Sequence, residues 1–215
     1  MIKKIKASRS EKIIFFFLIS LAIFSLSSFF LIKNKCLFVK DYNPEKLSFD
    51  KPNNIAILNV ECGNVIIELY PNISPNSVER FKTLVRSKAY DDVAFHRVIK
   101  DNLVQAGDLE FGKKGNIDYG KIGTGQSGLG TINSEVDVPF NYDRGSVGLA
   151  RTQKYNTEDS QFFITLKDEP LYESEYTPIG KVIYGIAALE KIKYQSKSEY
   201  VLRPDFINSI KMLVD

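Results

Sequence analysis

The stretch that decides the fold is FHRVIKDNLVQAGD, residues 95–108. It contains two short apolar runs, residues 95–99 and 103–104, which polar residues separate. Gly- and Asn-rich stretches, without a helical pattern, separate the similar runs that follow, at residues 146–150, 161–166 and 179–182. Short strands with no helices between them predict an antiparallel sheet or barrel.

A hairpin and a helix precede this stretch. Residues 55–60 and 65–70 are two apolar runs around a turn that contains Gly63, which predicts two paired strands. Ser74 followed by Pro75 is typical of a helix start, and apolar residues then recur at helical spacing. The sequence therefore predicts a hairpin followed by one amphipathic helix.

The C-terminal part and the domain boundary are also readable. Residues 186–192 predict a second short helix, and residues 206–213 predict a closing strand. The long Gly-rich segment at residues 107–144 is of a length that usually carries function or its own structure. Residues 33–53 are polar and broken by Pro, which predicts a stalk before a folded domain at residues 54–215.

The N-terminal segment has the composition of a membrane span. Residues 13–32, which are 32 − 13 + 1 = 20 residues, carry no charge, and a helix of that length crosses about 30 Å of hydrocarbon. Residues 1–12 hold five basic residues and one acid, so the positive-inside rule keeps them in the cytoplasm. We therefore expect a signal-anchor helix in the inner (cytoplasmic) membrane, with the domain on the periplasmic side.

A cleaved signal peptide and a soluble periplasmic protein are the alternative. Signal-peptide cores are about 7 to 15 residues long and end in small residues, and Ser25 and Ser27 fit that pattern poorly. Cleavage there would leave residues 29–32 as an apolar terminus. Cys36 and Cys62 can pair outside the cytoplasm, although unpaired thiols are the commoner state for such positions.

Composition and charge exclude several classes of function. The chain of 215 residues carries a net charge of +3, but residues 36–215 carry 22 − 25 = −3, which disfavours nucleic acid as a partner. One His and two Cys cannot supply the four ligands of a structural zinc site, so we expect no metal. The single His96 has no acid at a telling spacing for Ser-His-Asp chemistry.

Arg97 lies within an apolar strand, where it is either one half of an ion pair on a sheet face or a functional cation. The motifs around it favour a functional role. They are FHRVI (95–99), QAGD (105–108), GTG (123–125), GSVGLAR (145–151), SQFFI (160–164) and YTPIGKV (176–182). With these motifs in this order, the chain resembles the cyclophilin family of peptidyl-prolyl isomerases over residues 54–215. Its short loops are more similar to those of bacterial members.

The resemblance implies both a fold and an activity. The fold is mainly β, a closed eight-stranded antiparallel barrel capped by two helices, here preceded by one transmembrane helix. The activity is cis-trans isomerisation of X-Pro bonds in proline-containing polypeptides, by a monomeric domain without metal or organic cofactor. Together with the anchor, it predicts an isomerase that assists the folding of exported proteins.

The resemblance also implies the residues of the site. Arg97 would be catalytic, Gln105 would bind the substrate backbone, and the N–H of Arg151 would hold the carbonyl oxygen that precedes the proline. The other residues expected to line the substrate site are Phe95, His96, Leu103, Ala150, Phe163, Leu171 and Tyr176.

Two positions depart from the family pattern. Asn102 stands where members usually have a second pocket Phe, and Pro170 stands where they have Trp, which weakens any expectation of cyclosporin binding. Because Asn102 makes the pocket wall partly polar, two alternatives stay open. One is a weakly active or inactive module that binds proline peptides at the membrane, and the other is a structural barrel that positions another protein.

Overall fold

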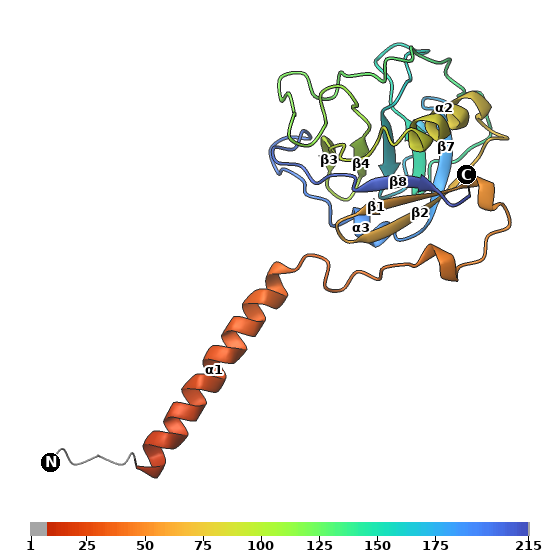
Figure 1. Cartoon of the computed structure of the whole chain (residues 1–215). Coiled ribbons are helices and arrows are strands. Elements are labelled where there is room, and N and C mark those ends of the chain that lie inside the picture. The colour runs from red at the N-terminus through yellow and green to blue at the C-terminus, as the bar shows by residue number, and fades with distance from the viewer. Residues whose placement is uncertain (1–7, 215) are drawn as a thin grey trace. The chain divides into compact units, whose positions relative to one another are not determined.

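The computed structural model of the chain describes residues 8–214 (Figure 1). It divides into two compact units, Met1–Phe38 and Val39–Asp215, which are described separately. The first part of the predicted cytoplasmic tail, residues 1–7, lies outside the described residues.

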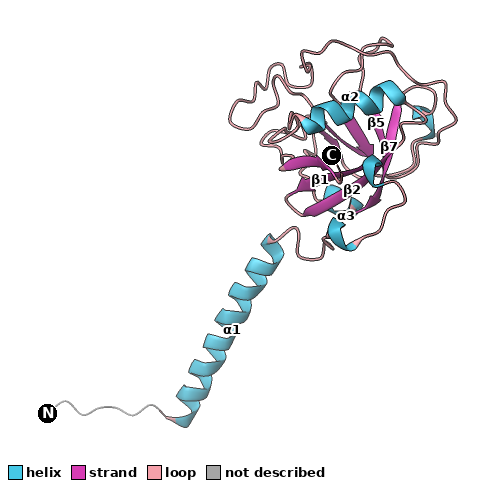
Figure 2. Cartoon of the chain, turned by 45° about the vertical axis from the view of Figure 1, so that its right-hand side comes forward, coloured by secondary structure: helices cyan, strands magenta, loops and turns pink. Residues whose placement is uncertain are grey.

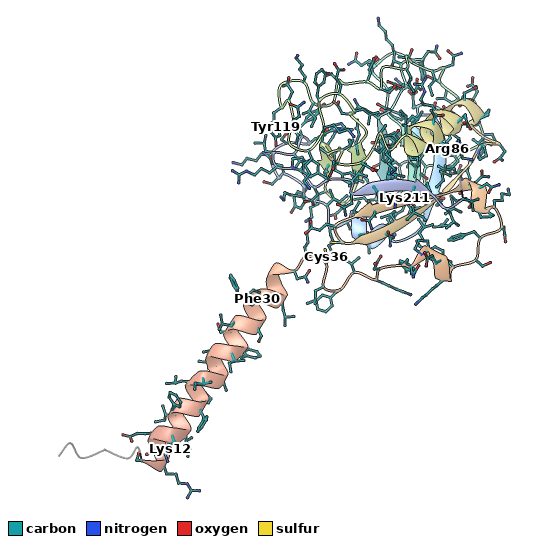
Figure 3. All side chains as sticks on the ribbon, viewed as in Figure 1. Lys12, Phe30, Cys36, Arg86, Tyr119 and Lys211 are labelled. Carbon is teal, nitrogen blue, oxygen red and sulfur yellow. The ribbon has the colours of Figure 1, made fainter. Side chains whose placement is uncertain are left out.

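The first unit is built around one long helix, α1 (Arg9–Lys33). Ser8 and Glu11 form a capping box at its start, in which each side chain bonds the other's backbone N–H. Figure 3 shows its side chains standing out around the helix, and none of the span Arg9–Leu31 is buried. An 18-residue window of this span has a mean hydropathy of 2.5, so α1 is long and apolar enough to serve as a membrane anchor or a signal sequence.

The second unit is an eight-stranded, curled antiparallel sheet with helices packed on it (Figure 2). The strands are β1 (Ile55–Val60), β2 (Gly63–Leu69), β3 (Arg97–Ile99), β4 (Leu103–Ala106), β5 (Ser146–Leu149), β6 (Phe162–Thr165), β7 (Pro178–Tyr184) and β8 (Ser209–Met212). Their order is β3-β4-β6-β5-β7-β2-β1-β8. The predicted mainly β fold and its antiparallel sheet are therefore confirmed.

The closed barrel that we expected is only partly realised. β3 and β8 are the edges of the sheet, and the segments before them approach each other through the isolated bridge Ala94↔Phe206. Two main-chain bonds extend this approach, from Ile207 N–H to Val93 O and from Phe95 N–H to Asp205 O. Over the described residues, irregular segments and not a continuous ladder join the two edges.

The predicted hairpin and first helix are present. β1 and β2 pair from Ile55↔Glu68 to Val60↔Gly63, and Gly63 adopts a φ of +122° that favours glycine. The helix α2 (Pro75–Arg86) begins at the Ser74–Pro75 step, but the Ser74 side chain makes no capping bond. The carboxylate of Glu135 takes that role, because it accepts from the backbone N–H groups of Asn76 and Ser77.

The remaining helices are short. α3 (Ile186–Leu189) begins at the predicted residue, directly after Gly185 in the left-handed conformation, but ends after one turn, three residues short of the predicted helix at residues 186–192. The 3-10 helices are η1 (Pro44–Lys46), η2 (Pro52–Asn54) and η3 (Pro170–Tyr172). In Figures 1 and 2, α2 and α3 lie on opposite sides of the strands.

The core lies between α2 and the sheet. Phe81 of α2 is fully buried, and its ring lies 5.5 Å from Phe162 of β6 and 5.3 Å from Tyr90. The hydroxyl of Tyr90 donates to the carbonyl oxygen of Ser160, which satisfies its polar end inside the core. This packing fixes the strand β6 and the segment before it, which lead to the site.

Part of the predicted stalk lies against the β1–β2 hairpin. The carboxylate of Asp41 accepts from the N–H of Asn64 at 2.8 Å, and the Tyr42 ring packs 5.2 Å from that of Tyr184.

Neither Cys36 nor Cys62 is a free thiol, and both are disulfide-bonded. The expectation of unpaired thiols is therefore wrong.

Candidate functional site

One row of paired residues crosses four strands and organises the site. Arg97 of β3 lies opposite Gln105 of β4, Gln105 lies opposite Phe163 of β6, and Phe163 lies opposite Gly148 of β5. Directly opposed residues present their side chains on the same face of a sheet. The register alone therefore places a cation, an amide and an aromatic ring side by side.

Gly148 is the last residue of this row, and its lack of a side chain leaves room for two aromatic rings. A Cβ at this position would come within 2.6 Å of both the Phe163 ring and the Tyr142 hydroxyl. The two rings instead stack over it, with their centroids 5.9 Å apart. Glycine in the GSVGLAR motif is therefore needed for close packing under the aromatic part of the site.

A groove of about 320 Å³ runs beside the row. Residues from β3, β4 and three separate loops line it, including Arg97, Gln105, Gly123, Thr124, Gly125, Ala150, Arg151, Gln161 and Tyr200. Most of the residues that line it have polar side chains, and the glycines of the loop 123–125 expose backbone groups to it. Its size and its walls suit an extended peptide segment.

A chain of hydrogen bonds connects Arg97 to the loop across the groove. Nη1 of Arg97 donates to Oε1 of Gln105 at 3.2 Å, and Nε2 of Gln105 donates to Oε1 of Gln161 at 3.1 Å. Nε2 of Gln161 then donates to the carbonyl oxygens of Gly123 and Gly125, each at 3.0 Å. The orientation of each amide is thus fixed by the next group in the chain.

The buried carboxylate of Asp108 holds that loop from beneath. Oδ2 accepts from the N–H groups of Gly123 (2.6 Å) and Gly125 (3.1 Å), and Oδ1 accepts from that of Phe111 (2.8 Å). A Cβ at position 125 would lie only 2.1 Å from this carboxylate. The GTG motif and the Asp of QAGD therefore form one structural unit.

An apolar cluster adjoins the groove at the aromatic end of the row. Leu103 and Phe163 are buried with Tyr142, and Ala150, Tyr172 and Tyr176 pack against them. Tyr172 lies 5.5 Å from Phe163 and 5.0 Å from Tyr176, in edge-on contacts. Four of the expected wall residues, Leu103, Ala150, Phe163 and Tyr176, are thus brought together.

Leu171 is not part of this cluster. Its side chain is 82% exposed, whereas its neighbour Tyr172 occupies the place that we expected Leu171 to fill. The 3-10 turn η3 (Pro170–Tyr172) directs the two side chains differently. The residue of this loop that packs on the cluster is therefore one position later than expected.

The unusual Asn102 is held by a polar partner beside the cluster. Its side-chain amide donates to the carboxylate of Glu169, which is 8% exposed, and its backbone carbonyl accepts from the N–H of Leu166. Lys167 pairs with the same carboxylate at 3.1 Å. The Asn102 amide nitrogen is thus satisfied by Glu169, whose main chain is in turn bonded to Tyr142 and Tyr172 of the aromatic cluster.

Arg151 is fixed on the opposite wall. Its guanidinium pairs with the carboxylate of Glu175 at 2.8 Å and lies over the rings of Tyr155 (4.2 Å) and Tyr176 (5.1 Å). Only 8% of its side chain is exposed. The Arg151 side chain is thus held in place by one carboxylate and two aromatic rings.

Phe95 and His96 lie beneath the groove, each 1% exposed. The His96 ring stacks on Tyr200, with the centroids 6.5 Å apart. Burial lowers the pKa of His96 to about 4, and the nearby carboxylate of Asp108 opposes the shift only partly. These two residues therefore support the groove and are not among the residues that line it.

Several residues of the site were missed from the sequence, and Glu199 and Tyr200 are the two that contact Arg97. Glu199 pairs with Arg97 across 102 positions of the chain, and Tyr200 forms an isolated bridge with the same residue. No spacing or motif marks either one, since the segment that carries them has no periodic pattern. Among the described residues, no group of three His, Cys, Asp or Glu side chains could hold a metal ion.

Comparison with known proteins identifies relatives over most of the second unit. Residues 55–212 match the family described as "Cyclophilin type peptidyl-prolyl cis-trans isomerase/CLD". A "Probable peptidyl-prolyl cis-trans isomerase" of Brucella suis is 44% identical over 161 residues, which cover 73% of this chain and 81% of the relative. A peptidyl-prolyl cis-trans isomerase of Acinetobacter baylyi is 31% identical over 153 residues, 69% and 76% of the two chains.

A solved structure shares the fold. The Cryptosporidium parvum cyclophilin type peptidyl-prolyl cis-trans isomerase, crystallised in the presence of the dipeptide Ala-Pro, superposes with a TM-score of 0.64. It is 27% identical in sequence, and the match covers 74% of this chain and 98% of that one.

The buried imidazole of His96 predicts a loss of stability in acid. Because its pKa falls from 6.5 to about 4 on folding, the unfolded chain binds the extra proton between these values. The contribution, on the order of 3 kcal/mol, is complete above pH 6.5 and is lost as the pH falls toward 4. NMR titration of the only His in the chain should give a pKa well below 6.5.

Comparing the wild type with His96→Asn separates the effect of His96 protonation on stability from the effect of carboxylate titration. The unfolding free energy should fall less between pH 7 and pH 5 in His96→Asn than in the wild type. A normal His96 titration near pH 6.5 would contradict the burial argument.

Proposed function

The chain belongs to the cyclophilin-type peptidyl-prolyl cis-trans isomerases, and we propose that it isomerises X-Pro bonds in exported polypeptides, with Arg97 as the catalytic residue. The observation that carries this proposal is the cross-strand row, which sets the Arg97 guanidinium two strands from the Phe163 ring. A proline ring against Phe163 would bring its nitrogen toward Arg97.

The chemistry needs no proton transfer and no covalent step. The barrier to rotation is about 18–20 kcal/mol, because the nitrogen lone pair is delocalised into the carbonyl. A guanidinium N–H that donates to the prolyl nitrogen localises this lone pair and weakens the double bond. Arg suits this role because it keeps its charge at any working pH.

The remaining contacts would hold the substrate on both sides of the turning bond. Gln105 would bind the peptide backbone, and the N–H of Arg151 would fix the carbonyl oxygen that precedes the proline. Ala150 and the loop 123–125 would border the neighbouring residue of the substrate. Donors that are already oriented can stabilise the twisted bond without first reorganising.

Removal of the Arg97 cation should abolish most of the turnover. We expect Arg97→Ala to lower kcat/KM for an Ala-Pro tetrapeptide by about 10²- to 10³-fold, the usual loss for one preorganised donor. Arg86→Ala is the matched control, since Arg86 is an exposed arginine of α2. Equal rates for the wild type and Arg97→Ala would favour the alternative of a proline-binding module.

The position of Tyr172 predicts that it, and not Leu171, forms the proline pocket. Tyr172→Ala should weaken binding of an Ala-Pro peptide by about tenfold, because it removes a ring that packs on Phe163. Leu171→Ala should leave the affinity within twofold, since that side chain is 82% exposed. Titration by NMR measures both, and a larger loss for Leu171→Ala would contradict the assignment.

We also place the domain outside the cytoplasmic membrane. The apolar helix α1 and the basic residues before it support an anchor with the N-terminus inside. Disulfide-bonded cysteines support an oxidising compartment. In this place the enzyme would meet proline-containing chains as they emerge from the membrane.

Protease accessibility tests the orientation. Protease added to spheroplasts should digest the domain, because the outer face of the membrane is then open to it. Full protection, with digestion only after lysis, would mean that the domain faces the cytoplasm. An N-terminal sequence of the mature protein distinguishes the anchor from a cleaved signal peptide.

A further inference from the structure

The Arg97 guanidinium has a second partner that lies outside the cross-strand row. Oε2 of Glu199 accepts from Nε at 2.8 Å and lies 2.7 Å from Nη2. Nη1 bonds Gln105 at 3.2 Å. All three nitrogens of the guanidinium are thus engaged by side chains from two different segments.

The main chain fixes Glu199 beside β3. The N–H of Val98 donates to the carbonyl oxygen of Glu199 at 2.8 Å, and the N–H of Val201 donates to that of His96 at 2.9 Å. Tyr200, between these bonds, forms the isolated bridge with Arg97. The backbone of Glu199 is therefore bonded directly to the strand that carries Arg97. This holds the carboxylate in a defined position relative to the guanidinium.

The contacts leave part of the guanidinium available. Arg carries five N–H groups. Glu199 accepts from Nε and pairs with Nη2, and Gln105 accepts from Nη1, so at least one N–H on each terminal nitrogen stays uncommitted. Arg97 lines the groove and is 29% exposed. Because Glu199 binds one edge of the guanidinium, it can orient the other edge while the N–H groups on that edge stay available to a ligand.

We propose that Glu199 is a positioning residue for the isomerase reaction, which holds the Arg97 guanidinium so that its uncommitted N–H groups face the groove. The inference rests on the proposed role of Arg97. Glu199 is itself 54% exposed, so water screens its charge and the pair leaves the donor strength of Arg97 largely intact. The carboxylate acts through geometry, and the prolyl nitrogen meets a donor that is already aimed.

Two substitutions separate geometry from charge. Glu199→Ala removes the acceptor and should lower kcat by about fivefold, which is about 1 kcal/mol at 1.4 kcal/mol per tenfold, with the affinity for the peptide unchanged. Glu199→Gln keeps an acceptor oxygen at the same reach and should stay within twofold of the wild type. The control is Glu190→Ala, which breaks the comparably exposed pair with Arg144 away from the groove.

The measurement uses the full chain in detergent micelles with an Ala-Pro tetrapeptide. Exchange NMR yields both the peptide affinity and the isomerisation rate, and ¹⁵N relaxation of the Arg97 Nε–H reports how firmly the side chain is held. The order parameter of this group should fall in Glu199→Ala and be retained in Glu199→Gln. In an Arg97→Ala background, Glu199→Ala should have no further effect on the rate.

Each contrary result has a distinct meaning. A rate for Glu199→Ala equal to or above the wild type, with Arg97→Ala inactive, overturns the positioning role and leaves the function of Arg97 intact. Equal losses for the Ala and Gln variants show that charge, not geometry, matters, and this also overturns it. An Arg97→Ala variant as active as the wild type removes the proposed function itself, and Glu199 then has nothing to position.

Discussion

The site depends on the antiparallel register across β3, β4, β6 and β5. That register places Arg97, Gln105, Phe163 and Gly148 in one line, so a slip of one residue in any pair would turn a member of the row to the other face. The fully buried side chains of these strands and the ring contacts of Phe162 with α2 resist such a slip. The arrangement of these four residues is therefore set by the packing of the core.

The polar wall of the groove is built on a buried charge. Asp108 is fully buried, and burial of a carboxylate is costly unless hydrogen bonds replace its hydration. Backbone N–H groups of Gly123, Gly125 and Phe111 supply those bonds. The cost of an unsatisfied Asp108 thus keeps the loop closed over it, and the loop in turn fixes Gln161 and Gln105.

Local patterns and motifs predicted much of this structure. The β1–β2 hairpin and α2 follow from periodicity within single segments, and Arg97, Gln105 and Phe163 follow from motif positions. Contacts between distant segments left no local signal: the Glu135 cap of α2 lies 58 or 59 positions away. The exchange of Leu171 for Tyr172 has a different cause, because a single irregular turn decides which of two neighbours faces inward.

Each arginine of the groove forms an ion pair with a glutamate, Arg97 with Glu199 and Arg151 with Glu175. Because each positive charge has a negative partner, the walls of the groove offer hydrogen-bond donors but produce little net electrostatic field. Long-range attraction would then neither select acidic chains nor repel basic ones, and recognition falls to the ring of the proline and the peptide backbone around it. Such a groove is suited to a generalist, which accepts many client sequences and discriminates weakly between them.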